Sequence, residues 1–117
     1  MLIGANNCDS MLENYERILQ GFNENVPNTK VVLCSMTAMG GKNWGKKNKT
    51  ACWNNVYIKQ YAGKYGYEFV DLFSPLFDTE IGEVYEGYTT DGGHFTELGY
   101  GVVSSLIKPA INMALEK

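Results

Sequence analysis

Two short runs of apolar and β-branched residues constrain the fold of this chain more than any other feature. They cover residues 30–35 and 67–72, and each has the composition and length of a buried strand. Between them, residues 50–65 carry Trp53, Val56 and Tyr57 at helical spacing, which predicts a helix with its apolar side toward the core. Parallel strands need such a crossover, because a tight hairpin cannot join them. The pattern therefore predicts an α/β fold.

Two more segments have the periodicity of amphipathic helices. Apolar side chains recur at helical spacing over residues 11–22, and Ser10 with Glu13 fits a capping box at the start of this helix. A second apolar stripe covers residues 98–115, where Thr96 is placed to cap the helix. Pro109 lies inside this stripe, so we expect the last helix to be kinked or split there.

The chain opens with an apolar stretch, residues 1–5, that runs into Asn6 and Asn7. This is typical of the end of a buried strand that breaks into a loop. The stretch has no charged residue or proline to protect a free edge, so we expect it to have a neighbouring strand. That neighbour is not in this sequence. Either a second chain supplies it, as in a homodimer, or an N-terminal segment is missing.

The order of the predicted elements defines an architecture. Right-handed crossovers between adjacent parallel strands place the first two helices on one face of the sheet, which leaves the last helix to cover the other. A chain of 117 residues is long enough for one domain and too short for two. We therefore predict a single domain over residues 1–117, built as a three-layer, flavodoxin-like α/β fold that lacks its N-terminal strands.

Composition and charge exclude several classes of function. The net charge is −3, whereas a nucleic-acid-binding domain needs a clear basic excess. Continuous apolar runs are much shorter than a membrane span, and no signal peptide is visible. The three cysteines have no C-x-x-C spacing, so neither a disulfide framework nor a zinc site is indicated. We expect no metal and no cofactor, and the compartment stays open because a leader would lie in a missing N-terminus.

The only histidine, His94, follows Asp91 by three residues, with Gly92 and Gly93 between them. An imidazole takes up and returns a proton near neutral pH, and a nearby carboxylate fixes its tautomer and stabilises the imidazolium. This spacing makes the two residues candidates for a general base and its orienting partner. Asp71, which follows the strand at 67–72, is instead expected to cap the next turn.

A loop rich in glycine and lysine, residues 36–49, follows the strand at 30–35. Gly40 and Gly45 have the spacing of a phosphate-binding loop, but Lys47 stands where that motif has serine or threonine. A flexible rim over a substrate cleft is the favoured interpretation, and a phosphate binder is an alternative. Three aromatic residues in loops are candidates for this substrate rim: Trp44, Tyr85 and Tyr88.

Two motifs resemble the SGNH hydrolases, also called the GDSL-type lipases and esterases. Residues 4–7 read Gly-Ala-Asn-Asn, which is similar to the family's third block, G-x-N-D, except that asparagine replaces the aspartate. Residues 91–94 match the family's fifth block, D-x-x-H, and Gly99 with Tyr100 follows at the family's spacing. The resemblance covers essentially the whole chain and corresponds to the C-terminal portion of the family.

The resemblance implies a serine esterase that acts on small acyl or acetyl esters, with acetylated carbohydrates among the candidate substrates. By position, His94 would be the general base, Asp91 its orienting partner and Asn6 the oxyanion donor. The family's nucleophile block and its second block should precede residue 1, and neither is present. Ser10 is better explained as a helix cap. We therefore predict that this chain alone does not hydrolyse esters.

A second hypothesis is a module without catalytic activity. It would keep the same fold and bind a partner or a second copy of itself by adding a strand to its first strand, residues 1–5. This hypothesis needs an exposed strand edge, whereas the esterase hypothesis needs His94 and Asp91 to lie side by side.

Overall fold

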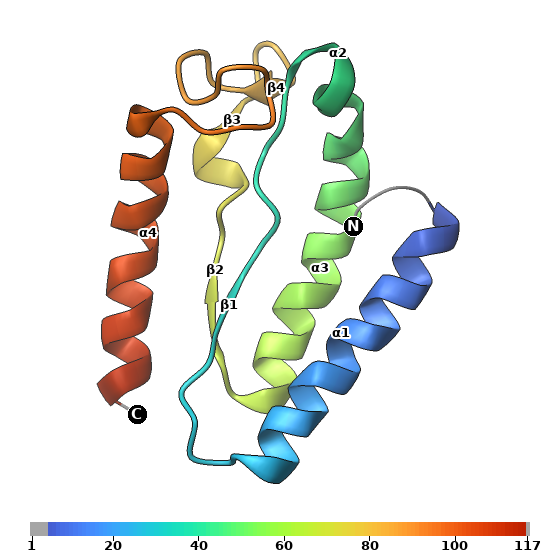
Figure 1. The fold of residues 1–117 in the computed structure, drawn as a ribbon, viewed down its shortest axis with the longest axis vertical. Helices are drawn as coiled ribbons and strands as arrows, with labels where there is room; N and C mark the ends of the chain where they lie inside the picture. Colours follow the sequence, from blue (N-terminus) through green and yellow to red (C-terminus); the bar gives the residue numbers. More distant parts are fainter. Residues whose placement is uncertain (1–4, 117) are drawn as a thin grey trace.

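The computed structural model describes the backbone of residues 5–116 and the side chains of residues 11–116. Two parallel strands form its centre, and helices cover both sides of them (Figure 1). Two short 3₁₀ turns, Gly45–Lys47 and Ser74–Leu76, interrupt the other elements. The helices and strands are α1 (Ala5–Asn25), β1 (Val32–Cys34), α2 (Gly41–Trp44), α3 (Asn48–Tyr65), β2 (Glu68–Val70), β3 (Phe77–Asp78), β4 (Glu83–Val84) and α4 (Glu97–Glu116).

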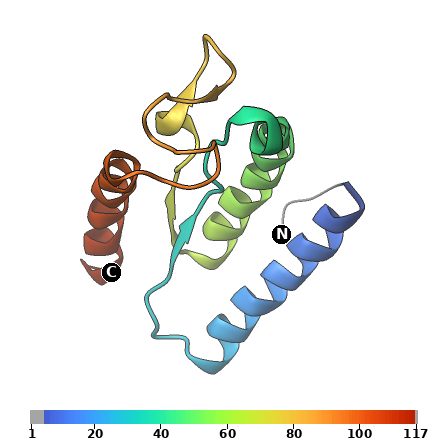
Figure 2. The same cartoon turned by 45° about the horizontal axis from the view of Figure 1, so that its top comes forward.

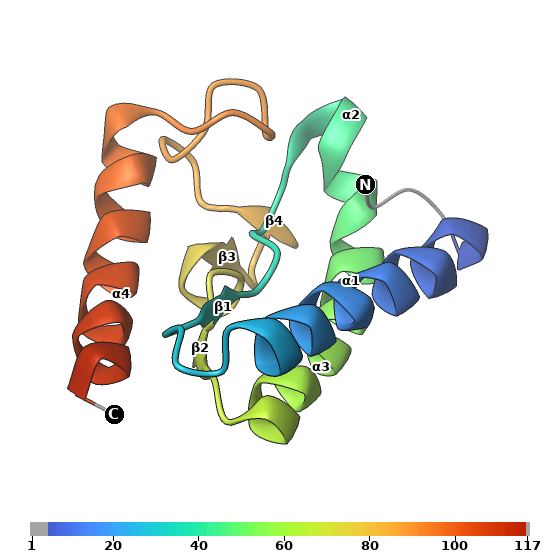
Figure 3. The ribbon, with the colours of Figure 1, turned by 60° about the horizontal axis from the view of Figure 1, so that its bottom comes forward.

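The layers have the predicted arrangement. Strands β1 and β2 pair in parallel, with Leu33 opposite Phe69 in the register. Helices α1 and α3 pack against each other on one side of this pair, and α4 lies on the other side (Figures 1 and 3). Parallel strands with helices on both faces confirm the α/β fold class.

Three groups of buried side chains join the layers. Leu19 of α1 and Ile58 of α3 pack with Leu33 of β1. On the opposite face, Ala110 of α4 packs with residues of β2 and the turn that follows it. The third group lies beyond the ends of the strands and holds the long loops together; its buried members are Ala38, Ala51, Phe73, Leu76 and Val84.

The helix at α3 is confirmed, but the face predicted to be buried is wrong. Trp53 and Val56 are 48% and 54% exposed, whereas Ala51 and Ala62 are fully buried. The face that packs inward carries these alanines and the buried Ile58, whereas Trp53 and Val56 point outward. Periodicity could not separate the two, because apolar residues lie on both sides of this helix.

The predictions for the start of the chain need correction. The structure has α1 beginning at Ala5, so Asn6 and Asn7 are helical rather than part of a loop, and Ser10 lies within the helix rather than at its cap. No proline or β-branched residue separates Ala5 from Ser10, so nothing local ends the helix there. Of the strand predicted for residues 1–5, Ala5 is helical, and residues 1–4 lie outside the described residues, as does the edge on which strand addition depends.

Helix α4 begins as predicted and continues through Pro109. Thr96 caps it, since the Thr96 Oγ1 accepts a hydrogen bond of 3.2 Å from the Gly99 N–H. The expected split does not occur, because Ala110 and Ala114 lie just beyond Pro109 and are buried against the sheet. A proline removes one backbone hydrogen bond, and packing on both sides of it keeps the helix continuous.

Among the described helices, α4 is long and apolar enough to cross a membrane by length and composition alone. The expectation that no segment spans a membrane therefore stays a prediction for this helix. Tyrosine, serine, a lysine and a proline break the runs without making the helix polar on average. Only 17% of its most apolar window is buried, and α4 packs against β2 on one side.

Candidate active site

Asp91 and His94 form a direct pair in the loop that precedes α4. The Asp91 Oδ2 and the His94 Nδ1 are 2.8 Å apart. The other carboxylate oxygen, Oδ1, accepts hydrogen bonds of 2.9 Å from the backbone N–H groups of Gly93 and His94. This geometry is local, because it needs only that the chain turns tightly between Asp91 and His94. Gly92 makes the turn with a φ of +92°, which favours glycine.

The hydrogen bonds keep Asp91 ionised. The Gly93 N–H and then the His94 side chain lower the pKa of the Asp91 carboxyl from its usual value. An ionised carboxylate only accepts hydrogen bonds, so the neutral imidazole carries its proton on Nδ1 and leaves Nε2 as an acceptor. The His94 side chain is 72% exposed, which leaves this second nitrogen accessible to an incoming hydroxyl group. A pair with this geometry can act as a general base with an orienting carboxylate.

The pair lies at the end of the sheet where open α/β folds bind their ligands. The loops that follow β1 and β2 gather there with residues 77–95, beyond the carboxyl ends of both strands (Figure 2). Gly99, predicted to follow the histidine motif, faces the Tyr88 carbonyl so closely that no Cβ would fit. This contact seats the first turn of α4 directly under the loop that carries His94.

The loop after β1 reaches the same place and contacts the 91–94 loop. The Gly40 N–H donates a 2.9 Å hydrogen bond to the Gly92 carbonyl, and the Trp44 indole lies against Gly93. The Trp44 and His94 rings meet edge to face, with centroids 6.1 Å apart and planes at 87°. Of the three residues predicted to form the substrate rim, Trp44 is therefore the one that the structure brings to His94.

The other two rim candidates pair with each other. The rings of Tyr85 and Tyr88 meet at 5.8 Å, and Tyr88 also packs against the buried group beneath the loops. Tyr85 lines a hollow of about 240 Å³ that includes Gly92 and Glu83 but not His94. Their role at a substrate rim stays a prediction.

Asn6 and the serines do not contribute a described contact to His94. Asn6 lies in α1, and its side chain is outside the described part of the structure, so its role as oxyanion donor stays a prediction. Ser35 is buried, and its Oγ accepts from the Leu72 N–H at 2.7 Å and donates to the Met36 carbonyl. Among residues 11–116, no serine hydroxyl is hydrogen-bonded to His94.

Sequence reasoning missed three polar residues that shape the loop after β1. The side-chain amides of Asn48 and Asn55, on α3, each make two hydrogen bonds to one backbone unit, that of Met39 and Met36 respectively, at 2.7–3.2 Å. Glu83 accepts the Gly41 N–H at 3.0 Å. The available signal in the sequence was the spacing of Asn48, which lies three residues before Ala51 and therefore on the same face of α3. Glu83 also places a carboxylate where a phosphate would have to bind, which weighs against the phosphate-loop alternative.

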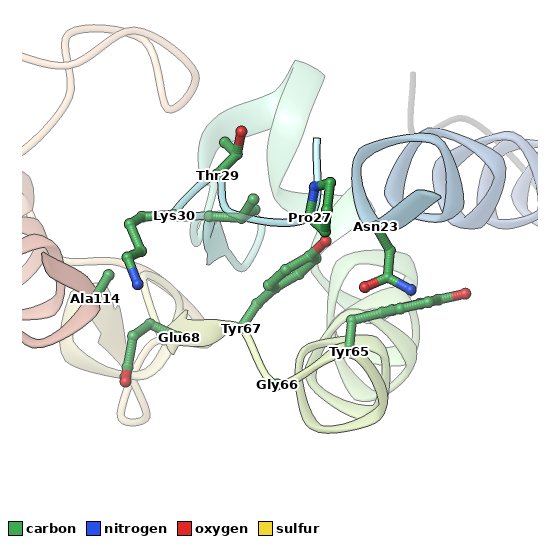
Figure 4. Close-up of a pocket in the computed structure, with 10 residues that line it drawn as sticks. Asn23, Pro27, Thr29, Lys30, Tyr65, Gly66, Tyr67, Glu68 and Ala114 are labelled. Carbon is green, nitrogen blue, oxygen red and sulfur yellow. The ribbon is translucent and has the colours of Figure 1, made fainter. Parts of the chain in front are cut away.

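A separate hollow of about 160 Å³ lies at the opposite end of the strands (Figure 4). Tyr65 and Tyr67 stack beside it, and Lys30 and Glu68 face each other across it. It contains no residue of the predicted site.

Among the described residues, no group of three or more histidine, cysteine or acidic side chains could hold a metal ion.

Comparisons with known proteins show the family and the fold of this chain. The sequence profile of the GDSL-like lipase/acylhydrolase family matches residues 1–102. A GDSL-like lipase from Bacteroides thetaiotaomicron VPI-5482 is similar in structure, with a TM-score of 0.81 and 28% sequence identity over 95% of this chain and 55% of that one. An acylhydrolase from Bacteroides fragilis NCTC 9343 gives 0.80 and 28% over 92% of this chain and 53% of that one.

A third solved structure, described as a platelet activating factor from Streptococcus pneumonia, has a TM-score of 0.72 and 29% identity over 87% of this chain and 50% of that one. The chain therefore spans about half the length of the solved structures that it matches. A comparison with curated proteins found no match.

Proposed function

Because this chain belongs to the GDSL-like lipase/acylhydrolase family, we propose that it carries the base half of a carboxylic ester hydrolase, with His94 as general base and Asp91 as its orienting partner. The observation that supports the proposal most directly is the 2.8 Å contact between the Asp91 Oδ2 and the His94 Nδ1. The exposed Nε2 is then the atom that would take the proton of an attacking hydroxyl group.

The chemistry follows from the charges in the pair. As a serine hydroxyl attacks the ester carbonyl, its proton passes to Nε2 and the imidazole becomes a cation. The ionised Asp91 stabilises that cation through Nδ1, and the imidazolium then gives the proton to the departing alkoxide. A hydrogen-bond donor such as Asn6 would stabilise the negative charge on the carbonyl oxygen in the tetrahedral intermediate.

The proposal needs a serine that the described part of this chain does not place at His94. We therefore propose that residues 1–117 alone hydrolyse no ester and that the nucleophile comes from a segment outside this sequence. Small acyl esters are the proposed substrates, with acetylated carbohydrates as one class. In this family the block that holds the serine comes before the block that residues 4–7 resemble, so the nucleophile would precede residue 4.

A chimaera tests this proposal. The part of the Bacteroides thetaiotaomicron lipase that this chain does not match would be joined to residues 1–117 at their N-terminus, and hydrolysis of p-nitrophenyl acetate measured. We expect hydrolysis by the chimaera and none by residues 1–117 alone. Asp91→Asn and His94→Ala should each lower kcat/KM of the chimaera by about 10²- to 10⁴-fold. A folded chimaera whose activity survives His94→Ala would rule out the assigned base.

A further inference from the structure

The His94 side chain has few contacts for a group that must keep one orientation. It is 72% exposed, and its ring makes one hydrogen bond among the described residues, that to Asp91. An exposed imidazole on two rotatable bonds samples several rotamers unless neighbours restrict it. The ring that restricts it in this structure is the Trp44 indole, edge to face at 6.1 Å.

Trp44 is itself held firmly. Its Cε2 atom lies 2.6 Å from the place that a Cβ on Gly93 would occupy, so the indole fills the space left by the missing side chain. The Lys47 Nζ lies 4.6 Å from the centre of the indole ring on a neighbouring turn, within cation–π distance. The segment that carries Trp44 is tied at its start by the bonds from Gly40 to Gly92 and from Gly41 to Glu83.

We propose that Trp44 is a positioning residue for His94, which holds the imidazole in the orientation that meets Asp91. The proposal rests on the function proposed above and goes beyond the predicted role of Trp44 as a substrate rim. It also gives the second glycine of the Asp-Gly-Gly-His sequence a purpose: Gly93 lacks a side chain so that the indole can lie beside the histidine. Residues that are far apart in the sequence thus lie together in one site.

The chain offers a matched control and a clean probe. Its second tryptophan, Trp53, is 48% exposed on α3 and makes its ring contact with Tyr57 instead. His94 is the only histidine, so one set of imidazole signals reports on it in an NMR spectrum. Neither probe needs enzymatic activity, so a failure here can be told apart from a failure of the proposed esterase function.

Fluorescence tests the contact. A protonated imidazole beside an indole quenches its emission. In the Trp53→Phe variant, which keeps only Trp44, emission should fall in one step as the pH is lowered through the protonation of His94. The step should be lost on adding His94→Ala. The Trp44→Phe variant, which keeps only Trp53, should show no such step. Equal steps in the two single-tryptophan variants would overturn the contact.

NMR tests the positioning. In Trp44→Leu of the 117-residue chain, we expect the imidazole ring protons to move to the shifts of a freely rotating histidine, and the pKa of the Asp91 carboxyl to rise toward its usual value as its histidine bond weakens. Trp53→Leu should change neither. If Trp44→Leu does not fold, Trp44→Phe decides, with smaller shifts of the same sign. Unchanged imidazole and Asp91 signals in a folded Trp44 variant would overturn the proposal.

Discussion

Two turns in this molecule are built on the same local plan and serve different ends. One follows β2 and begins at Asp71; the other begins at Asp91. In the first, the Asp71 Oδ1 accepts backbone N–H groups from the residues two and three positions later, at 2.8 and 3.0 Å. In the second, the Asp91 Oδ1 does the same at 2.9 Å for both. The capping geometry is therefore common to a structural turn and a candidate catalytic one.

The difference lies in what surrounds the carboxylate. The two residues after Asp71 are the buried Leu72 and Phe73, and the third is Ser74. After Asp91 come two glycines and His94, which takes the second carboxylate oxygen. Burial raises the pKa of Asp71, but the hydrogen bonds from Ser74 and Phe73 and the charge of Lys59 outweigh it, so the pKa is lowered. The partner of the second carboxylate oxygen, and not the capping bonds, therefore distinguishes the candidate site at Asp91 from the turn at Asp71.

The largest effect that separates the two turns is expected at Gly92. Its φ is +92°, and an added Cβ would overlap the Gly40 carbonyl, which is backbone and cannot swing away. We expect Gly92→Ala to lower the free energy of unfolding by about 2–4 kcal/mol, from strain and overpacking together. Urea unfolding of the 117-residue chain measures it. Leu72, at the same place in the first turn, has no such requirement.

Gly87 is the control for Gly92→Ala. It has the same φ of +92°, and an added Cβ would meet no atom within 4 Å. Gly87→Ala should therefore show only the backbone strain, about 1 kcal/mol. Equal losses in the two variants would mean that the close approach of Gly40 to the 91–94 loop contributes nothing to stability.

The second effect is a difference between the two aspartates: Asp71 should matter more for stability, and Asp91 more for the orientation of His94. Asp71→Ala removes a cap over the buried Leu72 and Phe73, and we expect it to lower the free energy of unfolding by about 1 kcal/mol. Asp91→Ala, in a more exposed loop, should destabilise the fold less while it releases the His94 ring. Urea unfolding measures the first loss, and the imidazole signals of His94 measure the second. A larger loss of stability for Asp91→Ala than for Asp71→Ala would contradict this difference between the two aspartates.

The turns also show which parts of the site the sequence could predict. Asp91 and His94 are three residues apart, so their contact follows from a tight turn and needs no tertiary information. Trp44 reaches His94 only because the Gly40 backbone meets that of Gly92, and no spacing in the sequence encodes this approach. The buried amides of Asn48 and Asn55 were missed for the same reason, since their partners are backbone groups of another segment.

In the fold, too, local patterns were predictable and tertiary packing was not. The alternation of β-branched runs with helical periodicity predicted β1, β2 and the three long helices, because each pattern is local. The orientation of α3 was not predictable, since Trp53 and Val56 form an apolar stripe that competes with the one containing Ala51 and Ala62. Only the tertiary packing of α3 against β1 and β2, which buries Ile58 together with the alanines, decides between the two stripes.

The smallest expected effect is on the response of stability to acid. The pKa values of Asp71 and Asp91 are both lowered in the folded protein, so each carboxylate stabilises the fold above the unfolded-state value of about 3.9. That stability is lost as the pH falls through the lower, folded-state values. His94→Ala removes the side-chain bond, one of the three hydrogen bonds that lower the pKa of Asp91, so its folded value should rise toward the unfolded one. The contribution of Asp91 to acid sensitivity should shrink accordingly.

Asp71 provides the reference for this last measurement, because its cap involves no histidine. The slope of unfolding free energy against pH below about 4 should be shallower in His94→Ala than in the unchanged chain. It should be shallower again when Asp71→Asn is added, because that removes the second lowered carboxyl. NMR titration of the two carboxyl carbons assigns each change: in His94→Ala the pKa of Asp91 should rise, and the pKa of Asp71 should stay the same. A shift of both carboxyls, or of neither, would show that the bond between Asp91 and His94 is not what separates the two turns.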